Sequence, residues 1–257
     1  HVIGLQDAVT GLGVSGEPGA VSISGVCLDS RLVRPGDLYV ALPGFHSHGA
    51  AFSTQAVERG AIAILTDPAG ARAAGDAGVP VLVSHRLRPV MAEVSARVYG
   101  EPARELELFG ITGTNGKTTT VALLEATLAA TGRRVGTIGT LGFRLDGVAL
   151  PSGRSTVTTP DSPDLQALLA LMRERGAEAV AIEVSSHAMA MSRVDALKFA
   201  VVAFLNLGRD HLDFHHNMEE YFEAKASLFT PEHAREAVVW IDDEYGRRIA
   251  DRAQRAG

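Results

Sequence analysis

The segment from Gly110 to Thr120 reads Gly-Ile-Thr-Gly-Thr-Asn-Gly-Lys-Thr-Thr-Thr, in which small residues surround a single lysine. Glycines let a backbone turn tightly enough to aim several amide hydrogens at a phosphate, and the N-terminus of a following helix adds positive charge. In such a loop Lys117 reaches the terminal phosphates and the Thr118 hydroxyl binds the accompanying Mg²⁺. Ile111 stands where a glycine is usual, so a Gly/Thr-rich strand-to-helix turn is the alternative. The sequence predicts ATP as the ligand, bound by Gly113, Thr114, Asn115, Gly116, Lys117, Thr118 and Thr119.

A carboxylate and two hydroxyls follow a later apolar run, in the segment Ile182-Glu183-Val184-Ser185-Ser186-His187. A hard divalent cation prefers oxygen ligands of this kind. Glu183 could instead be a solvated strand end, but the phosphate loop favours a role in binding Mg²⁺.

Histidines gather between Asn206 and His216. His211 and His215 are four residues apart and would share one face of a helix, as zinc ligands do, so zinc hydrolysis is a rival interpretation. The segment offers no clear third ligand. We therefore interpret His215 and His216 as surface residues and keep only His211 as a candidate site residue.

Lys225 lies in a helical pattern among apolar neighbours, which are Tyr221, Phe222, Leu228 and Phe229. Burial of an ammonium group is costly, so the pKa of Lys225 should fall and the amine should be partly neutral and nucleophilic. A neutral amine can add carbon dioxide, and the resulting carbamate could bind a metal. The alternative is a lysine whose head group reaches past the apolar edge to water.

These residues require a parallel sheet to bring them together. Five apolar runs alternate with helical patterns, and they are Leu108 to Thr112, Val135 to Gly139, Ala179 to Val184, Val201 to Asn206 and Ala237 to Ile241. One helix carries Val121 and ends near Gly132; another begins with Ser162 as its cap and ends near Gly176. If each strand is followed by a crossover helix, the carboxyl ends of the strands meet at one edge.

The first hundred residues have shorter apolar runs separated by Pro and Gly turns, which indicates a separate small α/β domain. The segment from Tyr99 to Arg104 combines Gly, Pro and charge, and we place the domain boundary there. The net charge of -6 excludes a general basic surface for nucleic acid. The single cysteine, Cys27, excludes an internal disulfide, and no apolar stretch is long enough to insert into a membrane. We expect a soluble, cytoplasmic protein.

Five motifs in order resemble those of the Mur ligases. They are Gly113 to Thr119, Thr158-Thr159-Pro160, Glu183 to His187, Asn206 to His215 and Tyr221 to Phe229. Near the N-terminus, Asp29-Ser30-Arg31 and the segments Pro35 to Leu38 and Ala41 to Gly44 are similar to the uridine-nucleotide domain of that family. The resemblance runs from about residue 26 to residue 245.

The resemblance implies an ATP-dependent amide ligase of peptidoglycan synthesis. Its substrates would be UDP-N-acetylmuramoyl-L-Ala-D-Glu and an amino acid, diaminopimelate or lysine, which becomes the third residue of the stem. ATP would phosphorylate the terminal carboxylate, and the incoming amine would displace phosphate. Mg²⁺ and Lys117 would neutralise charge on the transferring phosphoryl group.

The resemblance also assigns roles to matching residues. Lys117, His211 and Lys225 would be catalytic; the metal site would consist of Thr118, Glu183, His211 and carbamylated Lys225. The muropeptide would be positioned by Thr158, Thr159, Ser185 and Arg193, and the uridine diphosphate would meet Ser30, Phe45, His46 and Ser47. Met191 and Leu205 depart from the usual family residues, so no contact is transferred to Met191.

The expected fold class is α/β, with an N-terminal UDP-muramoyl-binding domain at 1–100 and an incomplete, P-loop ATP-binding domain at 106–257. The family's C-terminal domain would be absent, so we expect partial nucleotide recognition without completed ligation. We also expect a monomer. Other ligases of the superfamily, for folylpolyglutamate or for the muramoyl tripeptide, are alternatives; the segments at Asp29 and Asp210 argue against the former. A regulatory nucleotide-binding module is the alternative from another class.

Overall fold

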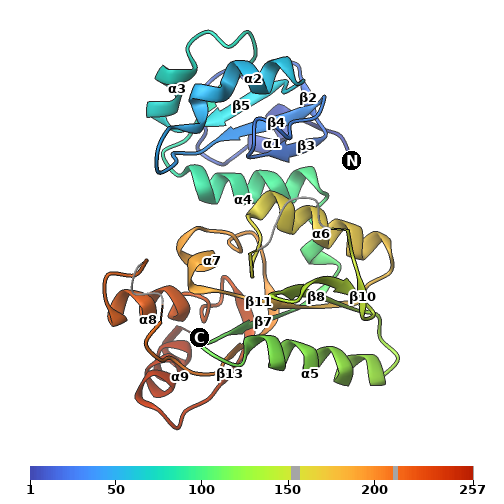
Figure 1. Ribbon diagram of the computed structural model, residues 1–257, viewed down its shortest axis with the longest axis vertical. Coiled ribbons are helices and arrows are strands. Elements are labelled where there is room, and N and C mark those ends of the chain that lie inside the picture. The colour runs from blue at the N-terminus through green and yellow to red at the C-terminus, as the bar shows by residue number, and fades with distance from the viewer. Residues whose placement is uncertain (152–156, 211–213, 257) are drawn as a thin grey trace. The chain divides into compact units, whose positions relative to one another are not determined.

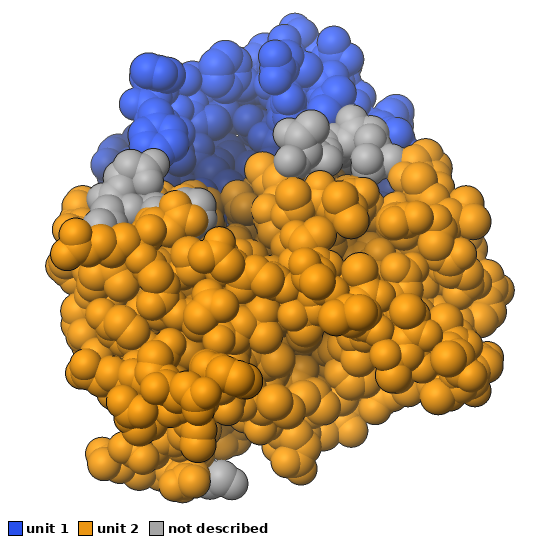
Figure 2. Space-filling model, turned by 60° about the horizontal axis from the view of Figure 1, so that its bottom comes forward, with its two compact units in different colours: residues 1–101 blue, residues 102–257 orange. Residues whose placement is uncertain are grey.

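The computed structural model describes residues 1–151, 157–210 and 214–256. The chain divides into two units, His1–Glu101 and Pro102–Gly257, which are coloured separately in Figure 2. Each unit has its own sheet and its own core, and each is described here by itself.

Unit 1 is built on a parallel sheet of four strands in the order β3-β4-β5-β6, beside an antiparallel pair, β1-β2. All five residues of β4 are buried, as expected for an inner strand of a sheet covered on both faces. Val90, Met91 and Val94 of α4 pack against Leu38 and Leu65 of the sheet. The elements are β1 Ile3–Gly4, α1 Leu5–Val9, β2 Ser22–Ile23, β3 Gly25–Cys27, β4 Asp37–Ala41, η1 Gly49–Phe52, α2 Ser53–Glu58, β5 Ala63–Thr66, α3 Pro68–Ala74, β6 Val81–Val83 and α4 Leu87–Val98.

Unit 2 contains a larger sheet, and its described strands follow the order β10-β9-β8-β11-β7-β12-β13. Strands β8, β11, β7, β12 and β13 run parallel to one another. Strands β9 and β10 are antiparallel and lie at the edge of the sheet next to β8. The elements are η2 Pro102–Arg104, β7 Glu107–Thr112, α5 Lys117–Ala130, β8 Val135–Gly139, β9 Gly142–Leu145, β10 Val148–Ala149, α6 Ser162–Glu174, β11 Ala179–Glu183, α7 Ser186–Ala190, β12 Phe199–Phe204, α8 Met218–Ala226, β13 Ala234–Val239 and α9 Glu244–Ala256.

Two helices cover opposite faces of this sheet (Figure 1). Val121 of α5 packs with Ile111 and Ala181, while Leu165 of α6 packs with the alternate residues Leu108 and Val180. The alternation arises because successive side chains of a strand point to opposite faces. Among the described residues, the helices lack the combination of length and apolar composition that spanning a bilayer requires.

The predicted α/β class with parallel sheets is confirmed, and three details are wrong. A hairpin of β9 and β10 separates β8 from α6, so β8 is not followed directly by a helix. The last strand, β13, begins at Ala234, three residues before the predicted run. The N-cap of α6 is Asp161 and its side chain makes no capping hydrogen bond, so Ser162 is the first helical residue rather than the cap. Asp161 is instead engaged by an arginine of the candidate site.

Candidate functional site

The phosphate-loop segment connects the carboxyl end of β7 to the N-terminus of α5, which begins at Lys117 itself. Gly116 caps the helix with φ 87°, a left-handed conformation that side chains with a Cβ rarely adopt. Gly113 makes a close approach, since a Cβ there would lie 3.0 Å from the Cβ of Leu205. Both glycines are therefore required by the backbone path. The loop has the strand-loop-helix context that the sequence predicts for binding phosphate.

Lys117 folds back over the loop that precedes it. Its Nζ donates to the carbonyl oxygens of Gly113 at 2.8 Å and Thr114 at 3.0 Å. Burial lowers the pKa of Lys117, while the negative charges of Glu183 and Asp210 oppose that shift. The amine is thus held at the mouth of the loop.

Glu183 lies at the carboxyl end of β11, beside β7 in the sheet. Its side chain is 1% exposed, and its Oε2 accepts a hydrogen bond from Thr118 Oγ1 at 3.0 Å. Thr140 donates its backbone N–H to Oε1 at 2.9 Å and its hydroxyl to Oε2 at 3.3 Å. Gly139 leaves room for this carboxylate, because a Cβ there would meet Oε1 at 2.2 Å. The structure therefore brings together two oxygen donors, on Thr118 and Glu183, that the sequence predicts for Mg²⁺.

The loop after β12 supports the phosphate loop from the other side. Asn206 accepts the Asn115 N–H at 2.9 Å through Oδ1 and donates through Nδ2 to the Asn115 carbonyl at 3.1 Å. The Thr114 N–H donates to the Asn206 carbonyl at 3.0 Å. These paired bonds fix the direction of the backbone where phosphate is expected.

Lys225 comes from α8 and is buried, with 1% of its surface exposed. Its Nζ donates to the Gly113 carbonyl at 3.1 Å and lies 4.8 Å from the ring centroid of Tyr221. Burial, together with the positive charge of the neighbouring Lys117, lowers the pKa of Lys225 to about 7, and Asp210 acts in the opposite direction. The lysine does not reach water, so the solvated alternative weighed from the sequence is wrong. Its amine lies within the same site as the phosphate loop.

The histidine predictions have mixed outcomes. His211 lies outside the described residues. His216 is exposed as expected, but His215 is buried, 4% exposed, and packs against the rings of Tyr221, His187 and Phe214. His215 lies before α8 rather than on a helix, which removes the helical spacing on which the zinc interpretation rested. In the part of the chain that the structure describes, His, Cys, Asp and Glu side chains form no group of three suited to a metal.

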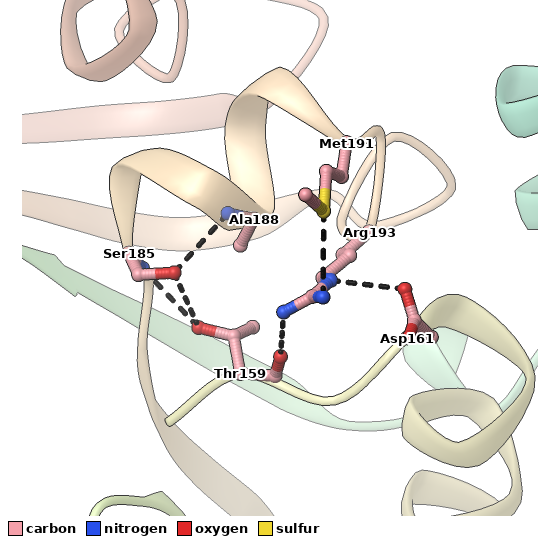
Figure 3. Close-up of polar contacts among 6 residues, drawn as sticks. All are labelled: Thr159, Asp161, Ser185, Ala188, Met191 and Arg193. Atoms are coloured by element: carbon pink, nitrogen blue, oxygen red, sulfur yellow. Dashed lines mark hydrogen bonds and ion pairs between the residues drawn. The ribbon is translucent and has the colours of Figure 1, made fainter. Parts of the chain in front are cut away.

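Three of the residues expected at the muropeptide, Thr159, Ser185 and Arg193, form one hydrogen-bonded group (Figure 3). Thr159 is fully buried; its hydroxyl donates to the Glu183 carbonyl at 2.7 Å and accepts the Ser185 N–H at 3.2 Å. Ser185 in turn caps α7. The Thr158 hydroxyl lies 3.2 Å from that of Thr140. Thr158, Thr159 and Ser185 are thus joined to the Glu183 strand end.

Arg193 points into the same group, as Figure 3 shows. Its Nε donates to Asp161 Oδ1 at 3.0 Å and its Nη1 donates to the Thr159 carbonyl at 2.8 Å. Its Nη2 faces Met191 Sδ at 3.4 Å, a weak acceptor. Of these three contacts of the guanidinium, the one made by Nη2 is therefore the weakest.

The residues expected at the uridine diphosphate lie in unit 1. Ser30 is buried and donates to Gln55 Oε1 at 2.6 Å. Phe45 is fully exposed, and His46 and Ser47 share its loop. The base of that loop is fixed because His48 accepts the Ala50 N–H at Nδ1 and so donates from Nε2 to Asp67, at 3.1 Å.

Three positions that contribute to the site were missed in the sequence. Gly139 is the last residue of β8 and Thr140 follows it, and the rule that parallel strand ends meet at one edge could have found them. Tyr221 was noted only as an apolar neighbour of Lys225, yet its hydroxyl lies 3.1 Å from Thr114 Oγ1. That contact joins residues 107 positions apart and has no local signal.

Comparison with known proteins matches both units to one family. Residues 111–257 match the model of the Mur ligase middle domain, and residues 22–99 match that of the Mur ligase family, catalytic domain.

The chain is 53% identical over 249 residues to the UDP-N-acetylmuramoyl-L-alanyl-D-glutamate--2,6-diaminopimelate ligase of Streptomyces coelicolor, covering 97% of this chain and 48% of that protein. It is 44% identical over 238 residues to the ligase of the same name from Corynebacterium glutamicum, covering 90% and 46%. A solved structure of a ligase with that name matches with a TM-score of 0.82 and 28% identity, over 99% of this chain and 50% of that one. The chain spans about half the length of the curated relatives it matches. Because a family model covers more than half of its residues, this chain belongs to the Mur ligase family.

Proposed function

We propose that this chain supplies the muropeptide-binding and ATP-binding parts of a ligase that joins 2,6-diaminopimelate to UDP-N-acetylmuramoyl-L-alanyl-D-glutamate. The names of its relatives support the choice of substrates. The site supports the chemistry, because a phosphate loop, a buried carboxylate and a buried amine converge at adjacent strand ends. We further infer that the reaction takes place in the cytoplasm, where ATP is available.

The reaction proceeds in two transfers. An oxygen of the substrate carboxylate attacks the γ-phosphorus of ATP, and the bond to ADP breaks. The amine of diaminopimelate then attacks the acyl carbon, loses a proton, and inorganic phosphate leaves. Lys117 and the loop amides stabilise negative charge on the phosphoryl oxygens, and the fixed loop lowers the cost of positioning. Electrostatic stabilisation of this kind is the main contribution of proteins to phosphoryl transfer.

Mg²⁺ fits the oxygen donors that the site provides. Thr118 Oγ1 and Glu183 Oε2 lie 3.0 Å apart, and the carboxylate is buried beside the phosphate loop. Thr118 and Glu183 would hold the cation, with His211 as a further proposed ligand. When bound, Mg²⁺ neutralises phosphate charge. Without a cation, Glu183 is satisfied by Thr118 and Thr140, which hold its carboxylate in place.

Lys225 has the chemistry needed to form a carbamate. Its pKa of about 7 leaves a substantial neutral fraction near neutral pH. The neutral amine adds CO₂ with release of one proton, so the product is a carbamate anion in place of the neutral amine, next to the start of the phosphate loop. We assign this modified lysine to the metal site together with Glu183.

Substrate positioning falls to two groups of residues. Thr158, Thr159, Ser185 and Arg193 would orient the peptide of the muropeptide, and its carboxylate would take the Arg193 edge that faces Met191. Ser30, Phe45, His46 and Ser47 would contact the uridine diphosphate.

The convergence of Lys225, Lys117 and Glu183 on the phosphate loop carries this proposal. Equilibrium binding of ATP with Mg²⁺, and separately of UDP-N-acetylmuramoyl-L-alanyl-D-glutamate, tests it on the 257-residue chain. We expect both ligands to bind, and Lys117→Ala to weaken ATP binding at least about tenfold through loss of a charged phosphate contact. Lys198→Ala, which changes an exposed lysine, is the matched control.

Two results would count against the ligase. If ATP binds and the UDP-dipeptide does not, the nucleotide-binding module becomes the better interpretation. If Lys117→Ala binds ATP as the wild type does, the phosphate loop is not the nucleotide site.

A further inference from the structure

Helix α8 contacts the phosphate loop through two side chains one turn apart. Lys225 donates to the carbonyl of Gly113 at 3.1 Å, and the Tyr221 hydroxyl lies 3.1 Å from the hydroxyl of the next residue, Thr114. Tyr221 has no exposed surface, and its ring contacts both the Lys225 amine and the ring of His215. The tyrosine therefore has little freedom to move relative to α8.

Thr114 is the point at which three segments meet. Its Oγ1 accepts the N–H of Gly208 at 2.9 Å and lies 3.3 Å from the Gly208 carbonyl, in the loop after β12. A threonine hydroxyl has one hydrogen and two lone pairs. If that hydrogen goes to the Gly208 carbonyl, Tyr221 is the donor to Thr114; if it goes to Tyr221, the tyrosine accepts. In both arrangements Tyr221 and Gly208 together satisfy the hydroxyl.

We propose that Tyr221 is a positioning residue for the nucleotide, and that it acts through Thr114. By fixing this hydroxyl, it holds the amides that follow Thr114 in the direction needed for phosphate and keeps the loop in register with the helix that carries Lys225. The proposal rests on the proposed function only in naming a nucleotide as the ligand of the loop.

The consequence for affinity follows from the loss of one hydrogen bond. Tyr221→Phe keeps the ring, and so the contacts with Lys225 and His215, but it removes the hydroxyl. Loss of that bond should weaken nucleotide binding about three- to tenfold. Because the effect passes through Thr114, Thr114→Val should weaken binding at least as much, and the double variant should bind like Thr114→Val alone.

The experiment titrates ADP with Mg²⁺ into the 257-residue chain and its variants. Tyr39→Phe is the matched control, since it removes a buried hydroxyl that donates to the Gly49 carbonyl in unit 1. Thr114→Ser keeps the hydroxyl and should retain most of the affinity. Hydrogen exchange at the amides of Thr114 and Gly208 is measured without nucleotide, and both should exchange faster in Tyr221→Phe.

If the fold-losses of ADP affinity in Tyr221→Phe and Thr114→Val multiply in the double variant, the two residues act independently and the proposal is overturned. Unchanged exchange at Thr114 and Gly208 in Tyr221→Phe would also overturn it. If the wild-type chain does not bind ADP, the proposed function fails, and hydrogen exchange still decides whether Tyr221 holds the loop. If Tyr221→Phe does not fold, Thr114→Val tests the same bond from the loop side.

Discussion

Lys225 shows most clearly what a single residue contributes to the site. Its apolar helical neighbours in the sequence predict burial and a lowered pKa, and both predictions are confirmed. Its partner, the Gly113 carbonyl, could not be predicted from helical spacing, because the two residues lie 112 positions apart and meet only when the Lys225 side chain of α8 reaches the loop after β7. The chemistry of Lys225 can therefore be predicted from the sequence, whereas its hydrogen-bond partner is determined by tertiary packing.

The lowered pKa of Lys225 makes folding stability depend on pH. The folded chain binds fewer protons than the unfolded chain between about pH 7 and pH 10.4, so stability should rise with pH across this window. Lys225→Met removes the buried cation and should be the more stable protein near pH 7, by a margin on the order of 2–4 kcal/mol. That margin should shrink as the pH approaches 10.

Urea unfolding of the wild type and of Lys225→Met at several pH values measures the margin. The exposed Lys198→Met serves as the control. A margin that stays constant from pH 7 to pH 10 would mean that Lys225 is not held in the environment described above.

At the level of the secondary-structure elements, the carboxyl ends of neighbouring strands hold the residues of the site. Thr112 of β7, Gly139 of β8 and Glu183 of β11 lie at the carboxyl ends of adjacent parallel strands. Four of the five strands of the parallel core were predicted within about two residues. The hairpin of β9 and β10 was not, because its strands are four and two residues long and give too few positions for an alternating pattern.

Gly139 provides the test at the level of the element. In Gly139→Ala the new methyl group would overlap the Glu183 carboxylate, so we expect a stability loss of about 1–3 kcal/mol together with weaker Mg²⁺-dependent ADP binding. Gly132→Ala is the matched control, because Gly132 has φ 86° at the far end of α5 and has no neighbour near its Cβ. Gly132→Ala should be less stable than the wild type but should bind ADP with Mg²⁺ at the wild-type affinity.

Thermal unfolding and ADP titration distinguish the two variants. Equal losses of affinity in Gly139→Ala and Gly132→Ala would show that destabilisation alone weakens binding. In that case the fit between Gly139 and Glu183 would have no specific role.

At the scale of the whole molecule, the chain separates into two units with independent cores. The hydrogen bonds that build the ATP site, from Gly113 to Lys225, join residues of unit 2. The composition around residue 100 indicated a boundary, but the pairing order of the strands in each sheet is a non-local property that local patterns do not contain.

Residues 102–257 expressed alone should fold and bind ADP with Mg²⁺ within about threefold of the affinity of the 257-residue chain. Residues 1–101 should show no such binding. Calorimetric titration of each piece makes the comparison. Loss of ADP binding from the folded 102–257 piece would mean that unit 1 contributes to the nucleotide site.

The proposed carbamate requires that Lys225, Glu183 and the phosphate loop form one metal-nucleotide site. ¹³C NMR of the chain in ¹³C-bicarbonate tests it most directly, with Mn²⁺-ADP added as a paramagnetic probe. We expect a carbamate signal that is absent in Lys225→Ala and that Mn²⁺-ADP broadens in the wild type but far less in Lys117→Ala. A wild-type spectrum without that signal, or a signal that Mn²⁺-ADP leaves sharp while the nucleotide is bound, would contradict it.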